Sequence, residues 1–127
     1  QTTQDVSTFW KALGARVVEV TAEEHDRQVA RVSHLPHAVA ATLVRAAGQK
    51  GLPFAGPGYR DTTRIAAGPT AMWAEILLEN RDEILSGLKE FRTDLQALEK
   101  ALEGRDAAAL TKFLEDAAKI RRSLPSP

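Results

Sequence analysis

The 127-residue chain contains no cysteine, which excludes disulfide bonds, zinc–thiolate sites and cysteine nucleophiles. Seventeen basic residues balance seventeen acidic residues, and this net charge of +0 argues against the basic surface that nucleic acids or anionic membranes require. No apolar run approaches the roughly 18 residues of a membrane span. We therefore expect no nucleic-acid or membrane partner, and the lack of cysteine fits a reducing compartment such as the cytoplasm.

Methionine is also scarce, because Met72 is the only one and the chain begins with Gln1. The first five residues are polar and lack the basic and apolar segments of a signal peptide. We therefore expect the chain to be part of a longer protein. With 43% hydrophobic and 27% charged residues, it has the composition and size of one globular domain.

Helical periodicity dominates the sequence and predicts about six helices. A capping pattern at Thr21 and Glu24 begins a long helix that runs to about Ala47. Pro36 lies inside that helix and should kink it or break it in two. Asn80 and Glu83 form a weaker capping pattern before another long helix.

The last two predicted helices end the chain as a pair. Gly104 should end the first of them and Asp106 should cap the second, so that a turn of only three residues joins the two helices. So short a connection predicts an antiparallel hairpin. Each helix has a broad apolar stripe that a bundle this small does not cover, so we expect a dimer interface there.

Two other segments depart from the helical pattern. Arg16–Val20 is short and rich in β-branched residues, which predicts a strand. A strand must pair, and the chain offers no second one, so we expect its sheet to lie outside this chain. Gly48–Gly58 holds four glycines and two prolines and should be a loop. The predicted fold is therefore all-α: a bundle of about six helices with one short N-terminal strand.

Three histidines lie close together in the sequence and form the first candidate site. His34 and His37 are three residues apart and therefore share one side of a helix, while His25 precedes Asp26. Histidine titrates near neutral pH, so the pair suits proton transfer or anion binding. Two metal hypotheses are open: a zinc site of Asp26, His34 and His37, and a metal-dependent hydrolase that uses the three histidines.

A second candidate site lies in the segment Gly56–Ala66, which holds two arginines, two threonines and two glycines. Arginine binds carboxylates and phosphates with two parallel hydrogen bonds, and glycine allows a ligand to approach the backbone closely. The alternative is a solvated loop in which Asp61 pairs with Arg64. Trp73, on the next helix, is either a core residue or a ligand contact.

Taken in chain order, these features resemble the C-terminal half of the prephenate dehydrogenase family. The resemblance rests on His25-Asp26, Ser33-His34-Leu35-Pro36-His37, Gly58-Tyr59-Arg60-Asp61-Thr62-Thr63-Arg64-Ile65-Ala66, Trp73 and Leu78-x-Asn80. It extends from about Phe9 to Asn80 and then fades into generic helices. The two longer runs, at this separation, make it specific.

The resemblance implies an N-terminal Rossmann domain that binds NAD or NADP, followed by a helical domain that dimerises and supplies part of the prephenate pocket. Such a domain resembles the dimerisation domain at the C-terminal end of 6-phosphogluconate dehydrogenase. Residues 1–20 would end the nucleotide-binding domain, and residues 21–127 would form the helical domain. The family's catalytic histidine lies in the Rossmann domain, so we expect this chain alone to bind no cofactor and to be inactive.

The resemblance also implies roles for residues of this chain in a reaction that oxidatively decarboxylates prephenate to 4-hydroxyphenylpyruvate in tyrosine biosynthesis. Arg64 matches an arginine that grips a substrate carboxylate, and either His34 or His37 matches a histidine of the pocket. The other residues expected at the substrate are Gly58, Arg60, Asp61 and Trp73. Pro57 stands where the family pattern has another glycine.

Two alternatives differ from this reading in function. An arogenate dehydrogenase would use the same pocket for a substrate whose amine replaces the keto group. A non-catalytic helical dimer that retains an aromatic-ligand pocket would lack a nucleotide-binding partner altogether.

Overall fold

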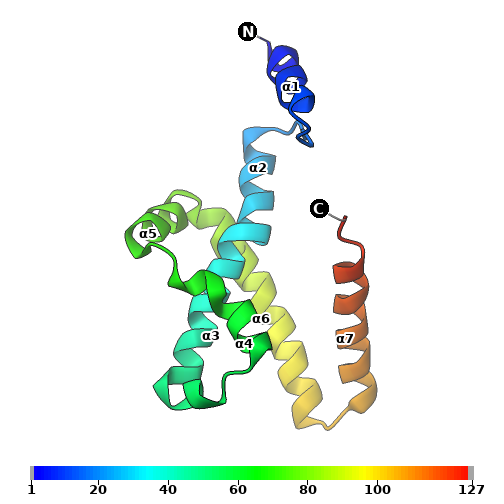
Figure 1. The fold of residues 1–127 in the computed structure, drawn as a ribbon. Coiled ribbons are helices and arrows are strands. Elements are labelled where there is room, and N and C mark those ends of the chain that lie inside the picture. The colour runs from blue at the N-terminus through cyan, green and yellow to red at the C-terminus, as the bar shows by residue number, and fades with distance from the viewer. Residues whose placement is uncertain (1, 126–127) are drawn as a thin grey trace.

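The computed structural model describes residues 2–125, which form an all-α fold as predicted (Figure 1). The helices are α1 (Thr3–Ala12), α2 (Ala22–Val29), α3 (Leu35–Gly51), α4 (Pro57–Thr63), α5 (Thr70–Glu79), α6 (Arg81–Glu103) and α7 (Ala107–Arg122). A π-helical turn, η1 (Ala30–His34), and two 3₁₀ turns, η2 (Leu52–Phe54) and η3 (Arg64–Ala67), connect some of them. Because α2, η1 and α3 form one continuous rod, the seven α-helices make six rods.

The long rod α2–η1–α3 is the centre of the domain. It begins where predicted, because the Thr21 side chain accepts a hydrogen bond from the backbone N–H of Glu24 at 3.2 Å. Pro36 does not break it. The π turn immediately before the proline accommodates the ring and the missing N–H, and Leu35 donates its backbone N–H to the Ala30 carbonyl.

The predicted strand at Arg16–Val20 does not form. Within residues 2–125 this segment has no regular secondary structure, because no other segment offers it a partner for backbone hydrogen bonds. The predicted loop Gly48–Gly58 is wrong in part. Gly48 leaves the helical conformation with φ of +58°, as a loop start should, but η2 follows and α4 already begins at Pro57.

The remaining helices pack around this rod. α6 lies along α2, η1 and α3 and also contacts α5, while η3 and α4 pack on α3. α7 runs back beside α6 to make the predicted hairpin, and Asp106 caps it by accepting the backbone N–H of Ala109 at 2.9 Å. α1 stands away from this group at the N-terminal end (Figure 1).

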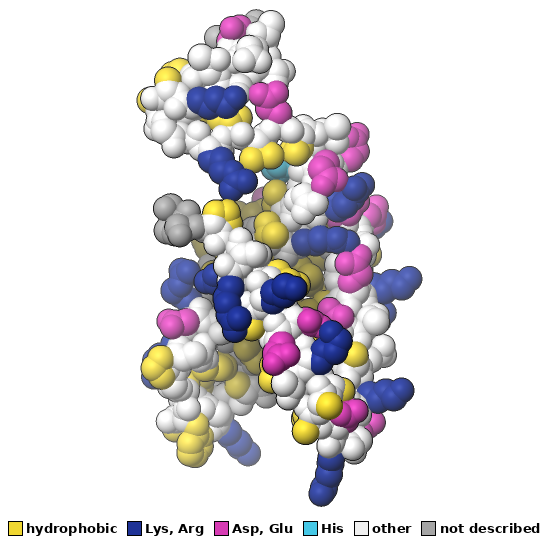
Figure 2. Space-filling view, turned by 90° about the vertical axis from the view of Figure 1, so that its right-hand side faces the viewer, with side chains coloured by type: hydrophobic (Ala, Val, Ile, Leu, Met, Phe, Trp, Pro, Cys, Tyr) yellow, Lys and Arg dark blue, Asp and Glu magenta, His cyan; other side chains and the backbone are white. Residues whose placement is uncertain are grey.

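The packing leaves much of the apolar surface uncovered. Within residues 2–125, the buried apolar residues are only Ala30, Ala40 and Ile84. The accessible surface is 10589 Å², against roughly 6,600 Å² for a compact monomer of this mass. Figure 2 shows apolar side chains in a hollow between charged ones on the face that carries α7. In residues 2–125 no helix is both long and apolar enough to cross a membrane.

Candidate functional site

His37 and Trp73 form a stacked pair between α3 and α5. Their ring centroids lie 3.6 Å apart with an interplanar angle of 12°. Gly68 allows this arrangement, since a Cβ atom there would lie 2.9 Å from Trp73 Nε1 and 3.4 Å from His37 Cε1. A side chain at Gly68 would therefore displace one of the two rings.

His37 is buried, with 6% of its surface exposed. Burial lowers the pKa of its imidazole, because a charged ring loses solvation in this environment. Its Nδ1 atom is also buried and has no hydrogen-bond partner among the described residues. A neutral ring with an unsatisfied nitrogen is unusual in a folded protein and marks this position for a specific role.

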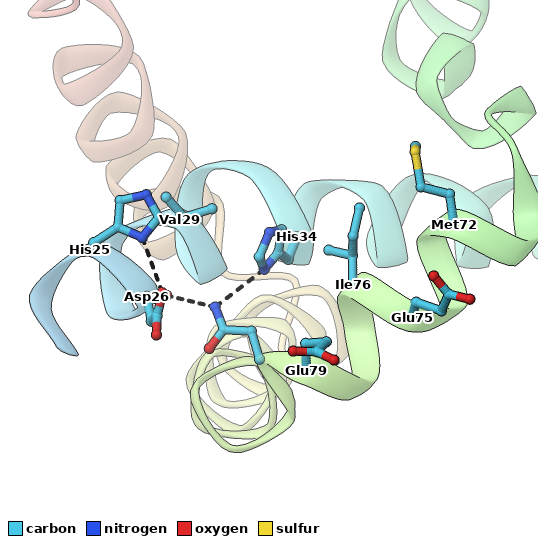
Figure 3. A pocket seen from close by; sticks show the side chains of 9 residues that line it. His25, Asp26, Val29, His34, Met72, Glu75, Ile76 and Glu79 are labelled. Atoms are coloured by element: carbon cyan, nitrogen blue, oxygen red, sulfur yellow. Dashed lines mark hydrogen bonds and ion pairs between the residues drawn. The ribbon is translucent and has the colours of Figure 1, made fainter. Parts of the chain in front are cut away.

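His34 occupies a different place, although it lies only three residues away. Its ring meets the edge of Trp73 at a centroid distance of 6.3 Å and an angle of 81°. It also lines a cavity of about 470 Å³ between the N-terminal half of the rod and α5 (Figure 3). The other lining residues are His25, Asp26, Val29, Met72, Glu75, Ile76, Glu79 and Asn80. Both histidines therefore contact Trp73, with the His37 ring buried and the His34 ring facing a cavity.

His25 and Asp26 lie at one end of this cavity and contact each other, with His25 Nδ1 3.0 Å from an oxygen of Asp26. Both side chains are exposed, and His37 is not among the lining residues. Within residues 2–125 no group of three or more histidine, aspartate or glutamate side chains is placed to hold a metal ion. Neither metal hypothesis has a ligand set in this structure.

The arginine-bearing segment packs on the long rod through contacts with α3. Arg64 begins η3, which packs directly on α3, the helix that carries His37. Arg64 and Asp61 are both exposed, and among the described residues neither forms an ion pair. The alternative in which they pair with each other is therefore wrong. Arg60 donates from Nε to the carbonyl of Ala55 at 3.3 Å, which holds it against the preceding turn.

Gly58 lies in the first turn of α4, and a Cβ atom there would meet nothing within 4 Å. Its expected role as a loop glycine close to the substrate stays a prediction. The expected substrate contacts of His34, His37, Arg60, Asp61, Arg64 and Trp73 stay predictions as well. The structure places His37, Trp73 and the Arg64 turn on or against α3, and His34 in a T-shaped contact with Trp73.

Sequence reasoning missed three kinds of residue at this site. Gly68 was not singled out, because its contact with Trp73 is tertiary. Asn80 appeared as a helix cap, yet its side chain caps nothing and donates instead to the Asp26 carbonyl at 2.8 Å. Glu75 and Glu79 carried no motif, although their spacing of four residues could have placed them on one face of a helix.

The fold and these features define an all-helical domain that holds a small histidine–tryptophan site and leaves an apolar face uncovered. The sequence profile of the prephenate dehydrogenase dimerization domain matches residues 21–116, and the chain belongs to this family. Prephenate dehydrogenase of Bacillus subtilis is 36% identical over 131 residues, which cover 98% of this chain and 35% of that protein. The chain thus spans about a third of this relative's length.

Solved structures of the same kind share the fold. Arogenate dehydrogenase of Synechocystis superposes with a TM-score of 0.85 at 26% identity, covering 95% of this chain and 48% of that chain. Prephenate dehydrogenase of Aquifex aeolicus, in complex with hydroxyphenyl propionate and NAD⁺, superposes with a TM-score of 0.78 at 32% identity. That match covers 94% of this chain and 43% of the other.

Proposed function

We propose that the chain is the helical part of an NAD- or NADP-dependent prephenate dehydrogenase. Such an enzyme converts prephenate to 4-hydroxyphenylpyruvate in tyrosine biosynthesis, and we propose the cytoplasm as its location. Residues 1–20 would end a nucleotide-binding domain, and residues 21–127 would bind substrate and dimerise. The observation that carries the proposal is the His37–Trp73 stack beside the Arg64 turn, within the segment that matches the family.

The chemistry of the site suits a carboxylate-bearing ring. Prephenate has two carboxylates, and Arg64 is exposed with no ion-pair partner in the described part of the chain, so its guanidinium is available for a bidentate contact. Trp73, which stacks on His37, adds an aromatic ring to the site. Contacts with these residues would orient the substrate. Orientation is the main contribution of the protein, because formation of the aromatic ring drives the reaction.

The residues described here do not fit a dinucleotide, since residues 2–125 contain no strand and no glycine-rich strand–turn–helix. NAD or NADP would accept the hydride as carbon dioxide leaves. We expect another domain to hold this cofactor, and this chain alone to oxidise no prephenate.

Calorimetric titration with prephenate tests the carboxylate receptor. We expect the wild-type chain to bind, and Arg64→Ala to weaken binding by at least tenfold, because a charge-assisted bidentate contact is lost. Arg92→Ala is the matched control, since Arg92 is an exposed arginine of α6 without an ion-pair partner in the described residues. Equal binding by Arg64→Ala and wild type would contradict the assignment, as would a wild-type chain that does not bind.

Arogenate is the alternative substrate, because a structural relative is named an arogenate dehydrogenase. A parallel titration with arogenate decides between the two, and tighter binding of arogenate would replace prephenate in the proposal. Binding of neither compound would favour the non-catalytic helical module.

We also propose that the chain dimerises through its uncovered apolar face. This apolar face consists of two neighbouring grooves, lined by Val39, Thr42, Leu43, Ala46, Leu88, Phe91 and Leu95, and by Leu95, Leu98, Glu99, Leu102 and Glu103. The accessible surface exceeds that of a compact monomer by about 4,000 Å², which leaves ample area for the 2,000 Å² or more of an obligate dimer. The description of the family as a dimerization domain supports a second copy as the partner.

A further inference from the structure

The side chain of Asn80 makes hydrogen bonds that its position at the start of α6 does not require. Asn80 links α5 to α6, and its backbone serves both helices: its N–H donates to the Ile76 carbonyl at 3.3 Å, and its carbonyl accepts from the Ile84 N–H at 3.1 Å. At the start of a helix an asparagine side chain normally accepts a hydrogen bond from the following turn. Here it makes no such bond and turns instead toward the α2–η1 rod.

The orientation of this amide is fixed by its partner. Asn80 Nδ2 lies 2.8 Å from the carbonyl oxygen of Asp26, and a carbonyl can only accept a hydrogen bond. Exchanging the amide nitrogen and oxygen would place two acceptors against each other, so the group that faces Asp26 is the NH₂. The same nitrogen lies 3.3 Å from Nδ1 of His34 (Figure 3, dashed lines).

This contact determines which nitrogen of His34 carries the proton. An NH₂ group only donates, so Nδ1 must accept, and a neutral imidazole that accepts at Nδ1 is protonated at Nε2. Among the described residues no protein group bonds to Nε2 of His34. The ring lines the 470 Å³ cavity, so the Nε2–H is left for a ligand.

The charges around the cavity select the kind of ligand atom that this donor meets. Glu75 and Glu79 line the same cavity and are exposed carboxylates, which repel a carboxylate group of a ligand. Asp26 adds a third negative charge at the other end. The acceptor is therefore an uncharged oxygen, a carbonyl or a hydroxyl, while a carboxylate of the ligand belongs with Arg64.

We propose that Asn80 is a positioning residue that holds His34 as the Nε2–H tautomer, so that His34 donates a hydrogen bond to a carbonyl or hydroxyl oxygen of the ligand. The identification of that ligand as the substrate rests on the proposed function. The tautomer of His34 does not rest on the proposed function, because it follows from contacts within this chain.

Nitrogen-15 NMR of the histidine side chains in this chain tests the tautomer, at about pH 8, above the usual histidine pKa of about 6.5. We expect His34 to be protonated at Nε2 in the wild type, with its signals assigned by their loss in His34→Gln. In Asn80→Asp, which has nearly the same shape, the acceptor carboxylate should move the proton to Nδ1. Asn80→Ala should give a mixture of both tautomers.

The matched control is Gln96→Glu, the same amide-to-acid change at an exposed position of α6, which should leave His34 unchanged. Helical circular dichroism confirms that each variant is folded. A wild-type His34 protonated at Nδ1, or an Asn80→Asp variant that keeps the wild-type tautomer, would overturn the proposal. Should Asn80→Asp fail to fold, the wild-type tautomer and its loss in Asn80→Ala decide the question.

Calorimetry then tests the ligand contact separately. Asn80→Asp and Asn80→Ala should each weaken prephenate binding by about tenfold, the value of one hydrogen bond to a ligand, and Gln96→Glu should not. Wild-type binding with unaltered affinity in both Asn80 variants would overturn the contact. Absence of binding by the wild type would contradict the proposed function, while the NMR result would still decide whether Asn80 sets the tautomer.

Discussion

The two sides of the α2–η1–α3 rod are built differently. On the side of α5 and η3, packing within the chain closes the structure: His37 is 6% exposed and stacked on Trp73. On the side of the α6–α7 hairpin, large apolar side chains stay open, with Leu114 63% and Ile120 72% exposed. The first side encloses the stacked His37–Trp73 pair, whereas the second presents apolar surface that no other described part of the chain covers.

This difference shows that one amphipathic helix pattern can serve two purposes. Near Trp73 the apolar and polar contacts set the positions of individual rings. Along α6 and α7 the apolar stripe does not position the rings of the candidate site. It contributes apolar surface area that a partner can bury. Substitutions on the two sides should therefore affect different measurements.

The largest effect is expected from Leu95→Lys on the apolar face, because Leu95 lines both grooves. Truncating or charging a central interface residue costs at least about 2 kcal/mol, roughly thirtyfold in the dimer dissociation constant. Sedimentation equilibrium measures it. Leu52→Lys is the control, since Leu52 is 49% exposed and Leu95 is 47% exposed. A dimer unaffected by Leu95→Lys, or equally weakened by Leu52→Lys, would contradict this interface.

A similar but smaller effect is expected on the closed side from Gly68→Ala. The added Cβ would lie 2.9 Å from Trp73 Nε1, and overpacking of this kind costs about 1–3 kcal/mol in the free energy of unfolding. Urea unfolding measures it, and tryptophan fluorescence reports the displaced ring. Gly58→Ala is the control, because nothing lies within 4 Å of its added Cβ. Equal stabilities of the two variants would show that Gly68 does not hold the stack together.

The smallest effect is the pH dependence that His37 contributes. Burial lowers its folded pKa below the ordinary 6.5, so the unfolded chain takes up a proton more readily. Stability from this group is full above about pH 6.5 and is lost as pH falls toward the folded pKa, by at most about 1.4 kcal/mol per pH unit. Unfolding at pH 7 and pH 5 should show a difference that shrinks in His37→Gln and not in His25→Gln. An unchanged difference in His37→Gln would show that the pKa of His37 is the same in the folded and unfolded states.

Much of the fold could be predicted because its signals are local. Thr21 and Asp106 cap their helices through residues three positions away, and the short connection before α7 made the hairpin almost unavoidable. The strand at Arg16–Val20 was wrong because strand formation depends on a partner, which no local pattern supplies. Pro36 showed that the helix must adjust, and only the structure shows that a π turn absorbs the change.

The sequence singled out candidate site residues, whose substrate roles stay predictions, but it did not predict their arrangement. The spacing of His34 and His37 placed them on one side of a helix, yet the structure gives their rings different environments and different contacts with Trp73. Gly68 was not singled out and Asn80 was interpreted as a helix cap, because each acts on residues distant in sequence. Only the three-dimensional contacts distinguish a glycine whose missing side chain leaves room for an aromatic ring from a glycine that ends a helix.

The π turn also has a consequence for helical phase. In the π turn the Leu35 N–H reaches the Ala30 carbonyl, five residues back, where an α-helical hydrogen bond spans four. The rod therefore contains one residue more than an α-helical path between the same two ends requires. Wound as an unbroken α-helix, the same sequence would rotate His25 by about 100° relative to His37. The π turn therefore sets the rotation of His25 relative to His37, which a one-residue deletion in α3 after His37 would leave unchanged.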